Sequence, residues 1–161
     1  METVEPRRLT RRELLGWAWV ATLGALAAEG VGITLANLWP RTKSGGFGGK
    51  ITAGSVADFP IGSIVHNKDG KCYISHLEEG FLALYHKCTH LGCTVPWIAE
   101  EDRFNCPCHQ GIYNKKGEVL SGPPPRPLDL FPAEIVGGKV IVDTGRVIQR
   151  EKFDPSQVVK G

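Results

Sequence analysis

Hydrophobic and polar positions divide the chain into two parts with different patterns. Residues 14–39 form an apolar stretch with a single charge, Glu29, and are rich in Ala, Leu and Gly. A helix of this length, at about 1.5 Å per residue, would be roughly 39 Å long, which exceeds the ~30 Å hydrocarbon core of a membrane. Trp17, Trp19 and Trp39 lie near its ends, as interfacial aromatic residues do. The pattern predicts one transmembrane helix, Leu14–Trp39.

The residues before and within this stretch carry further signals, each with an alternative. Thr10-Arg11-Arg12-Glu13-Leu14-Leu15 matches a twin-arginine export signal, which would make residues 1–13 a cytoplasmic N-terminus. The same arginines also fit ordinary positive flanking charge, and Ala25-Leu26-Ala27 fits the cleavage site of a signal peptide. Glu29 indicates a polar partner helix, a protonated carboxyl, or a span shifted toward its N-terminal part.

After the apolar stretch the chain changes to a short Gly-rich segment. Pro40 cannot continue a helix because it lacks an N–H. Four glycines follow within residues 45–49. Such a sequence holds no fixed path without support, so residues 40–50 are predicted to be a flexible hinge.

From Ile51 onward, short apolar or alternating runs alternate with turn residues, and no helical periodicity is evident until the last dozen residues. This pattern predicts a mainly β, antiparallel head over residues 51–161. Asp69-Gly70 and Gly137-Gly138 are typical of hairpin turns. The strands are predicted at 62–66, 71–76, 80–85 and 134–142, with long loops at 87–101 and 106–127.

The distribution of charged residues agrees with this division into an apolar stretch and a head. The net charge is +2, and residues 1–50 hold seven of the 19 basic and four of the 17 acidic residues. The basic surplus therefore flanks the apolar stretch. Nothing resembles the positive groove that binds nucleic acid, so a nucleic-acid partner is excluded.

Cysteine and histidine carry the candidate chemistry. Of the five cysteines, Cys72 lies in a strand-like run and is interpreted as a small buried hydrophobic residue. The other four gather with two histidines in two motifs, C-x-H-x-x-C over residues 88–93 (box one) and C-x-C-H over residues 106–109 (box two). Such density indicates a metal site, a disulfide, or both. A structural zinc site is one alternative, although it would leave one cysteine of each box without a role.

The two boxes resemble those of Rieske proteins of the cytochrome bc-type branch. The apolar anchor, the Gly-rich hinge and Gly122-Pro123-Pro124-Pro125, which resembles the proline loop that covers the cluster, extend the likeness over nearly the whole chain. The resemblance implies a head of stacked antiparallel sheets that carries one [2Fe–2S] cluster. The implied metal ligands are Cys88, His90, Cys106 and His109, and the implied disulfide joins Cys93 to Cys108.

The resemblance also implies a function. His109, with His90 beside it, is expected to hydrogen-bond a quinol and to accept its proton while an electron enters the cluster. The expected protein is a redox subunit of a quinol–cytochrome c-type oxidoreductase, single-pass in an energy-transducing membrane with its head on the positive side. Its expected partners are a cytochrome b-type subunit, a c-type cytochrome, quinol and membrane lipid, within a homodimeric complex.

Two redox alternatives stay open. A Rieske subunit of a molybdenum oxidase such as arsenite oxidase can share the export signal and the disulfide. A Rieske ferredoxin that feeds an oxygenase would lack the anchor, Cys93 and Cys108.

One departure from the resembled pattern concerns the reduction potential. In high-potential relatives, Gly-Ser-x-Tyr follows the histidine of box two, and the Ser and Tyr hydroxyls hydrogen-bond to sulfur. Here Tyr113 is present, but Gly111 takes the position of the serine. One bond that stabilises the reduced cluster should be missing, so the potential should be lower, which suits menaquinol as the donor. A serine introduced at residue 111 should raise the potential.

Overall fold

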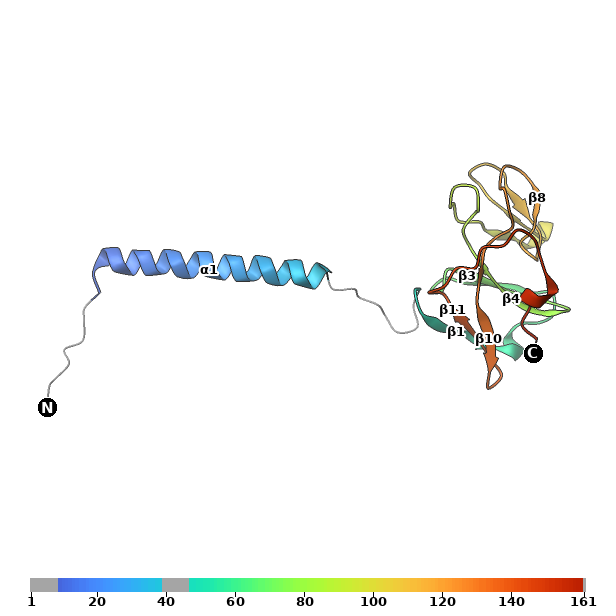
Figure 1. The fold of residues 1–161 in the computed structure, drawn as a ribbon, viewed down its shortest axis with the longest axis horizontal. Helices are drawn as coiled ribbons and strands as arrows, with labels where there is room; N and C mark the ends of the chain where they lie inside the picture. The colour runs from blue at the N-terminus through green and yellow to red at the C-terminus, as the bar shows by residue number, and fades with distance from the viewer. Residues whose placement is uncertain (1–8, 39–46, 161) are drawn as a thin grey trace. The chain divides into compact units, whose positions relative to one another are not determined.

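The structure, a computed structural model, describes residues 9–38 and 47–160. These residues form two separate units, an N-terminal helix and a head made of β-sheets (Figure 1). The prediction of a mainly antiparallel β head with a single N-terminal apolar helix is confirmed.

Helix α1 (Arg11–Leu38) begins three residues before the predicted span. A capping box explains this start, because the Thr10 N–H donates to the Glu13 carboxylate at 2.9 Å and the Glu13 N–H donates to the Thr10 hydroxyl at 3.3 Å. The two arginines of the export-signal pattern therefore lie in the first helical turn. Of the residues predicted at its far end, Trp39 and Pro40 lie outside the described part of the chain.

Three uncharged polar side chains along α1 form hydrogen bonds within the helix. Thr22, Thr34 and Asn37 each donate to the backbone carbonyl four residues earlier, at 2.8 to 2.9 Å. Hydrogen-bonding groups that are satisfied within the helix cost little in lipid. By length and composition, with 28 residues and an 18-residue stretch whose mean hydropathy is 1.5, α1 is able to cross a membrane.

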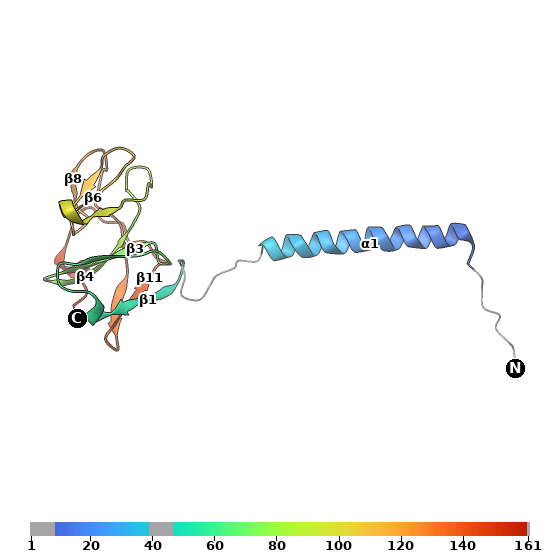
Figure 2. The same ribbon diagram turned by 180° about the vertical axis from the view of Figure 1, so that it is seen from behind.

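Three antiparallel sheets make up the head (Figures 1 and 2). Two of them form what we call the base, with strand orders β1-β11-β10 and β2-β3-β4-β9. The third, β5-β6-β7-β8, together with box one, box two and the proline loop, forms what we call the tip. The base strands are β1 (Lys50–Ser55), β2 (Ile64–Asn67), β3 (Cys72–Leu77), β4 (Gly80–Tyr85), β9 (Leu130–Phe131), β10 (Ala133–Val136) and β11 (Lys139–Asp143). The tip strands are β5 (Trp97–Ile98), β6 (Arg103–Asn105), β7 (Ile112–Tyr113) and β8 (Val119–Ser121).

The predicted base strands and both hairpins are confirmed. Strand β2 turns into β3 through residues 68–71, and Gly137-Gly138 closes the hairpin that divides the predicted strand 134–142 into β10 and β11. The prediction of two long loops is wrong, because β5, β7 and β8 lie within them. Strands of two or three residues are too short to show a period of two in the sequence.

Strands β3 and β4 are buried on both faces because a separate hydrophobic core lies on each side. Side chains alternate between the two faces of a strand. Tyr73 and Leu84 therefore point into the core shared with the tip, whereas Ile74 and Ala83 point into the core shared with β1 and β11. This central sheet is the platform on which the tip rests.

The C-terminal segment, whose role the sequence left open, is bound to both regions. It pairs with the base through bridges between Phe81 and Val159 and between Leu130 and Ile148. The buried Arg150 donates to the carbonyl oxygens of Leu128 and Lys116, on the tip side. Residues 146–160 thus act as a strap around the head.

Most of the predicted hinge, residues 40–46, lies outside the described residues. Its last part is held by the base. The Gly48 N–H donates to the Thr144 hydroxyl at 2.9 Å, and the Thr144 N–H donates to the Gly49 carbonyl at 2.9 Å. The Phe47 ring lies 6.1 Å from that of Tyr85, with Lys71 Nζ 4.3 Å from its centroid. Residues 47–50 are therefore held by the base and are not part of a free tether.

Candidate metal centre

The sequence motifs meet at the tip because three loops converge there. Box one lies in the connection from β4 to β5, box two in the connection from β6 to β7, and the proline loop (residues 122–128) between β8 and β9. A disulfide between Cys93 and Cys108 joins the two boxes. The Thr89 hydroxyl donates to the Arg126 carbonyl at 2.6 Å and thereby joins box one to the proline loop.

The two boxes adopt the same loop conformation. In box one, the Cys88 N–H donates to the carbonyl five residues later and the Cys88 carbonyl accepts from the N–H four residues later; Cys106 repeats both bonds in box two. The fourth residue after each cysteine has a positive φ, 74° at Gly92 and 56° at Gln110. Within this common frame the histidine stands two residues after Cys88 but three residues after Cys106.

The structure brings the four predicted ligands to this site with different exposures. Cys88 and Cys106 are buried, with 4% and 1% of their surfaces exposed, and both are free thiols. His90 is half-buried and His109 is exposed, and their ring centroids lie 4.9 Å apart. Two inward thiols and two outward imidazoles match the donor set expected for a [2Fe–2S] cluster with mixed ligands. Ligation by each residue stays a prediction.

The disulfide settles which cysteines are available as ligands. The Sγ atoms of Cys93, Cys106 and Cys108 all lie within 4.8 Å of one another. Because Cys93 and Cys108 are bonded to each other, only Cys106 in this group can offer a thiolate. A three-thiolate metal site is thus excluded here, and the role that the family resemblance implies for the second cysteine of each box is confirmed.

Tyr113 connects β7 to the site. Its hydroxyl lies 3.1 Å from Cys88 Sγ, and its side chain is fully buried. Burial, followed by the hydrogen bond to Cys88, raises the pKa of the Tyr113 phenol well above its usual value, so the phenol keeps its proton. When Cys88 is a thiolate, the phenol must be the donor. The Tyr113 hydroxyl thus contacts the sulfur of a predicted ligand.

Gly111 has a second reason to be glycine that the sequence did not reveal. A Cβ atom built at this residue would lie 2.6 Å from Cγ of Pro124 and 3.6 Å from Cβ of Cys106. The proline loop therefore occupies the space that a side chain would need. A serine cannot be added here without displacing Pro124, which the sequence expectation overlooked.

Sequence reasoning also missed two residues that organise the site, Thr89 and Arg126. Thr89 contacts the Tyr113 hydroxyl through both its N–H (3.4 Å) and its own hydroxyl (3.3 Å). Arg126 pairs with Asp129 through both guanidinium Nη atoms. The only signal in the sequence was that Arg126 and Asp129, two residues of opposite charge, stand three residues apart just after Pro123–Pro125.

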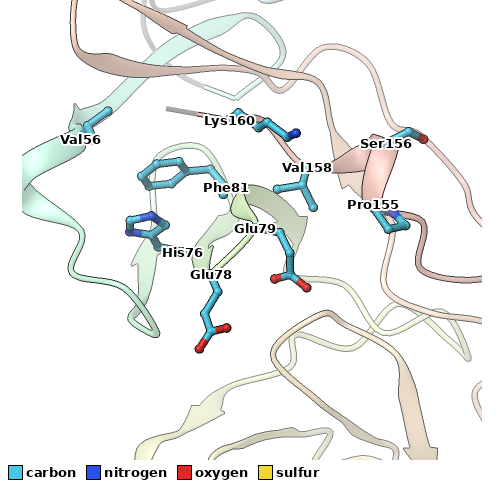
Figure 3. A pocket seen from close by; sticks show the side chains of 10 residues that line it. Val56, His76, Glu78, Glu79, Phe81, Pro155, Ser156, Val158 and Lys160 are labelled. Carbon is cyan, nitrogen blue, oxygen red and sulfur yellow. The ribbon is translucent and has the colours of Figure 1, made fainter.

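A surface hollow elsewhere on the head lacks the chemistry of the tip. It measures about 980 Å³ and contains no residue of either box. Figure 3 shows the Glu78 and Glu79 carboxylates beside Val158, Phe81 and His76. Glu79 is engaged by Lys116 Nζ at 2.9 Å. The candidate centre is therefore the tip.

The chain is similar to known proteins in sequence and in fold. Residues 51–132 match the family model described as Rieske [2Fe-2S] domain. The chain is 30% identical over 157 residues to cytochrome b6-f complex iron-sulfur subunit 1 of Synechocystis sp., covering 88% of each protein. It is 32% identical over 151 residues to the corresponding subunit of Microcystis aeruginosa, covering 83% of this chain and 84% of that protein. Among solved structures, a chain of a hyperthermophilic respiratory Complex III is 29% identical, with a TM-score of 0.49 over 76% of this chain and 97% of that one.

Proposed function

Because the chain belongs to the Rieske [2Fe–2S] domain family, we propose that it is the iron–sulfur subunit of a quinol-oxidising cytochrome bc-type complex. The observation that carries the proposal is the arrangement of the tip. Two buried thiols, one exposed imidazole and one half-buried imidazole lie in loops joined by a disulfide, and the described residues include one apolar helix. The relatives in Synechocystis sp. and Microcystis aeruginosa, which share most of their length with this chain, are subunits of cytochrome b6-f complexes.

In this proposal, buried residues of the tip hold the cluster and an exposed residue contacts the quinol. When bound, the cluster supplies one-electron acceptance and donation at a potential above that of four-cysteine clusters. Cys88 and Cys106 are buried, so a substrate cannot reach them. The His109 imidazole hydrogen-bonds the quinol hydroxyl and takes its proton; the exposure of His109 supports this role. His90 stands beside it as the second imidazole.

The partners and the membrane side follow from the same proposal. A cytochrome b-type subunit takes the second electron of the quinol and a c-type cytochrome accepts the first, within a homodimeric complex in membrane lipid. The head lies on the positive side of the membrane. A disulfide at the tip supports this side, since thiols are not kept reduced there. The export-signal pattern at residues 10–15 supports it independently.

The domain plan completes the proposal. Residues 1–13 are the cytoplasmic N-terminus, residues 14–39 span the membrane, and residues 51–161 carry the cluster. The hinge at 40–50 lets the head travel between the quinol site and the cytochrome. Since residues 47–49 are bound to the base, its free part ends before Phe47.

Menaquinol is the proposed donor. At Gly111 there is no hydroxyl, and Pro124 fills the space where a side chain would lie. Among the described residues, Tyr113 alone then donates a hydroxyl hydrogen bond to a ligand sulfur, that of Cys88 in box one. With fewer hydrogen bonds to stabilise the reduced cluster, the potential falls toward the range that menaquinol requires.

The test uses the native complex isolated from membranes. Addition of a reduced menaquinol analogue should reduce the c-type haem, and a ubiquinol analogue should do so more slowly. His109→Ala should abolish this reaction, whereas His66→Asn, a change at a half-buried histidine of β2, should leave it intact. Isolation with a molybdenum subunit and without haem subunits would instead assign the chain to a molybdenum oxidase.

A further inference from the structure

An ion pair closes the proline loop. Arg126 and Asp129 meet through both Nη atoms of the guanidinium and both oxygens of the carboxylate. Their side chains are only 19% and 12% exposed. The ion pair Lys50–Glu134 on the base, by comparison, is 66% and 53% exposed. A two-pronged, enclosed pair is held more rigidly and is less screened than a surface pair.

The backbone of the same two residues contacts both regions of the head. The Asp129 carbonyl accepts from the Tyr85 N–H at 2.7 Å, at the end of β4. The Arg126 carbonyl accepts from the Thr89 hydroxyl at 2.6 Å, inside box one. The ion pair therefore fixes the spacing between an anchor on the base and a contact at the predicted metal centre.

Thr89 connects the position of the proline loop to the hydrogen bond between Tyr113 and Cys88. A hydroxyl has one proton, and that of Thr89 is used by the Arg126 carbonyl, which can only accept. The Thr89 N–H faces the Tyr113 oxygen at 3.4 Å. The Tyr113 phenol then has two acceptors within reach, the Thr89 oxygen at 3.3 Å and Cys88 Sγ at 3.1 Å. It donates to Cys88, because a charged thiolate is a stronger acceptor than a neutral hydroxyl. The chain of contacts runs from the ion pair through the loop carbonyl to the hydrogen bond on a ligand.

We propose that the Arg126–Asp129 ion pair is a positioning device that holds the proline loop on box one, so that the Tyr113 hydrogen bond to Cys88 stays formed. The pair acts through the geometry of the loop and not through the field of either charge. The proposal rests on the family assignment of Cys88 as a cluster ligand. It does not depend on which quinol or cytochrome the protein uses.

Charge removal at each residue separates these two mechanisms. A field effect gives opposite signs, because losing the cation of Arg126 lowers the reduction potential and losing the anion of Asp129 raises it. A positioning effect gives the same sign for both, because either change releases the same loop. Arg126→Gln and Asp129→Asn are therefore the informative variants. Lys50→Gln and Glu134→Gln are the matched controls on an exposed pair.

The first measurement is voltammetry, in detergent, of the full chain with its cluster. The second is hydrogen exchange of two amides at the end of the proline loop, that of Tyr85, which donates to the Asp129 carbonyl, and that of Leu128, which donates to the Gly117 carbonyl at 2.8 Å. Both single variants should lower the potential by similar amounts, and the double variant should lower it no further. Exchange at the two amides should become roughly five- to thirtyfold faster, while the β3–β4 ladder stays protected. The controls should change neither quantity. Shifts of opposite sign in the two variants, or unchanged exchange, would overturn the proposal.

Discussion

The base and the tip of the head differ in the length of their strands. Apart from β9, the base strands have four to six residues, whereas every tip strand has two or three. Short strands supply few ladder bonds, and a small sheet needs further support to be stable. In the tip this support comes from the disulfide, from the close contact of Pro124 with Gly111, and from the cluster when it is bound. The site is thus built where the backbone pairing is weakest.

The cysteines also differ between the base and the tip, as Cys72 and Cys106 show. Cys72 lies in β3 of the base and is fully buried, and burial raises the pKa of its thiol to about 12. It therefore stays a neutral thiol and packs as a hydrophobic residue. Cys106 is equally buried but lies in a tip loop beside the disulfide. Burial alone does not distinguish a structural cysteine from a predicted ligand, whereas the region of the head in which each cysteine lies does.

The largest expected effect tests this pair of cysteines. Cys106→Ser should abolish the EPR signal of the reduced cluster, because serine does not replace the thiolate. Cys72→Ala should keep the full signal and cost the protein about 1 kcal/mol of unfolding free energy for the atom removed. EPR of the reduced proteins with iron analysis measures both. A signal lost in Cys72→Ala with the fold intact would contradict the division between base and tip.

The second effect concerns the disulfide. Cys93→Ser or Cys108→Ser leaves all four predicted ligands but frees loops separated by 15 residues. A loop of this size corresponds to about 3 kcal/mol of stabilisation. Loss of cluster absorption should therefore occur at lower urea concentration, and the reduction potential should fall, while the base unfolds at its former midpoint. If either serine variant retained its cluster as firmly as the parent, the disulfide would not be what supports the tip.

The third effect separates the two roles of Gly111. Gly111→Ala and Gly111→Ser both add a Cβ that must displace Pro124, so each should destabilise the tip by about 1–3 kcal/mol. Only serine adds a hydroxyl, so the difference between the two variants isolates the hydrogen bond. The serine variant should have the higher potential, by tens of millivolts, since about 1.4 kcal/mol corresponds to 59 mV for one electron. Equal potentials by voltammetry would refute the hydrogen-bond argument for menaquinol.

The sequence predicted what depends on period and on motif. Strands β3 and β4 carry runs of apolar residues bounded by turns, so their existence and pairing could be inferred. Strands β5 to β8 could not, because strands of two or three residues are too short to show a period in the sequence. The predicted ligands of the centre lie in two short motifs, so the sequence could nominate them; their ligation stays a prediction.

Contacts between distant residues could not be read in the same way. Thr89 and Arg126 are 37 residues apart, and the space at Gly111 is taken by a proline 13 residues later. Neither of these two contacts produces a recognisable pattern of neighbouring residues in the sequence. The sequence also missed that residues 47–49 are bound to the base. Glycines predict a flexible backbone, and the contacts with the distant residues Thr144 and Tyr85 that hold this segment leave no local pattern.

The smallest expected effect tests whether the base holds the tether independently of the tip. The Phe47 ring packs on Tyr85 and Phe131, with centroids at 6.1 and 6.2 Å, so Phe47→Ala should remove about 1 kcal/mol of contact energy. Hydrogen exchange at the amides of Gly48 and Thr144 should then become roughly fivefold faster. Phe47→Leu, which keeps apolar area, should show a smaller change. Because no contact of Phe47 reaches the boxes, the reduction potential should not move. Unaltered exchange at Thr144 would show that the backbone bonds alone hold this segment, and a shifted potential would show that base and tip are coupled.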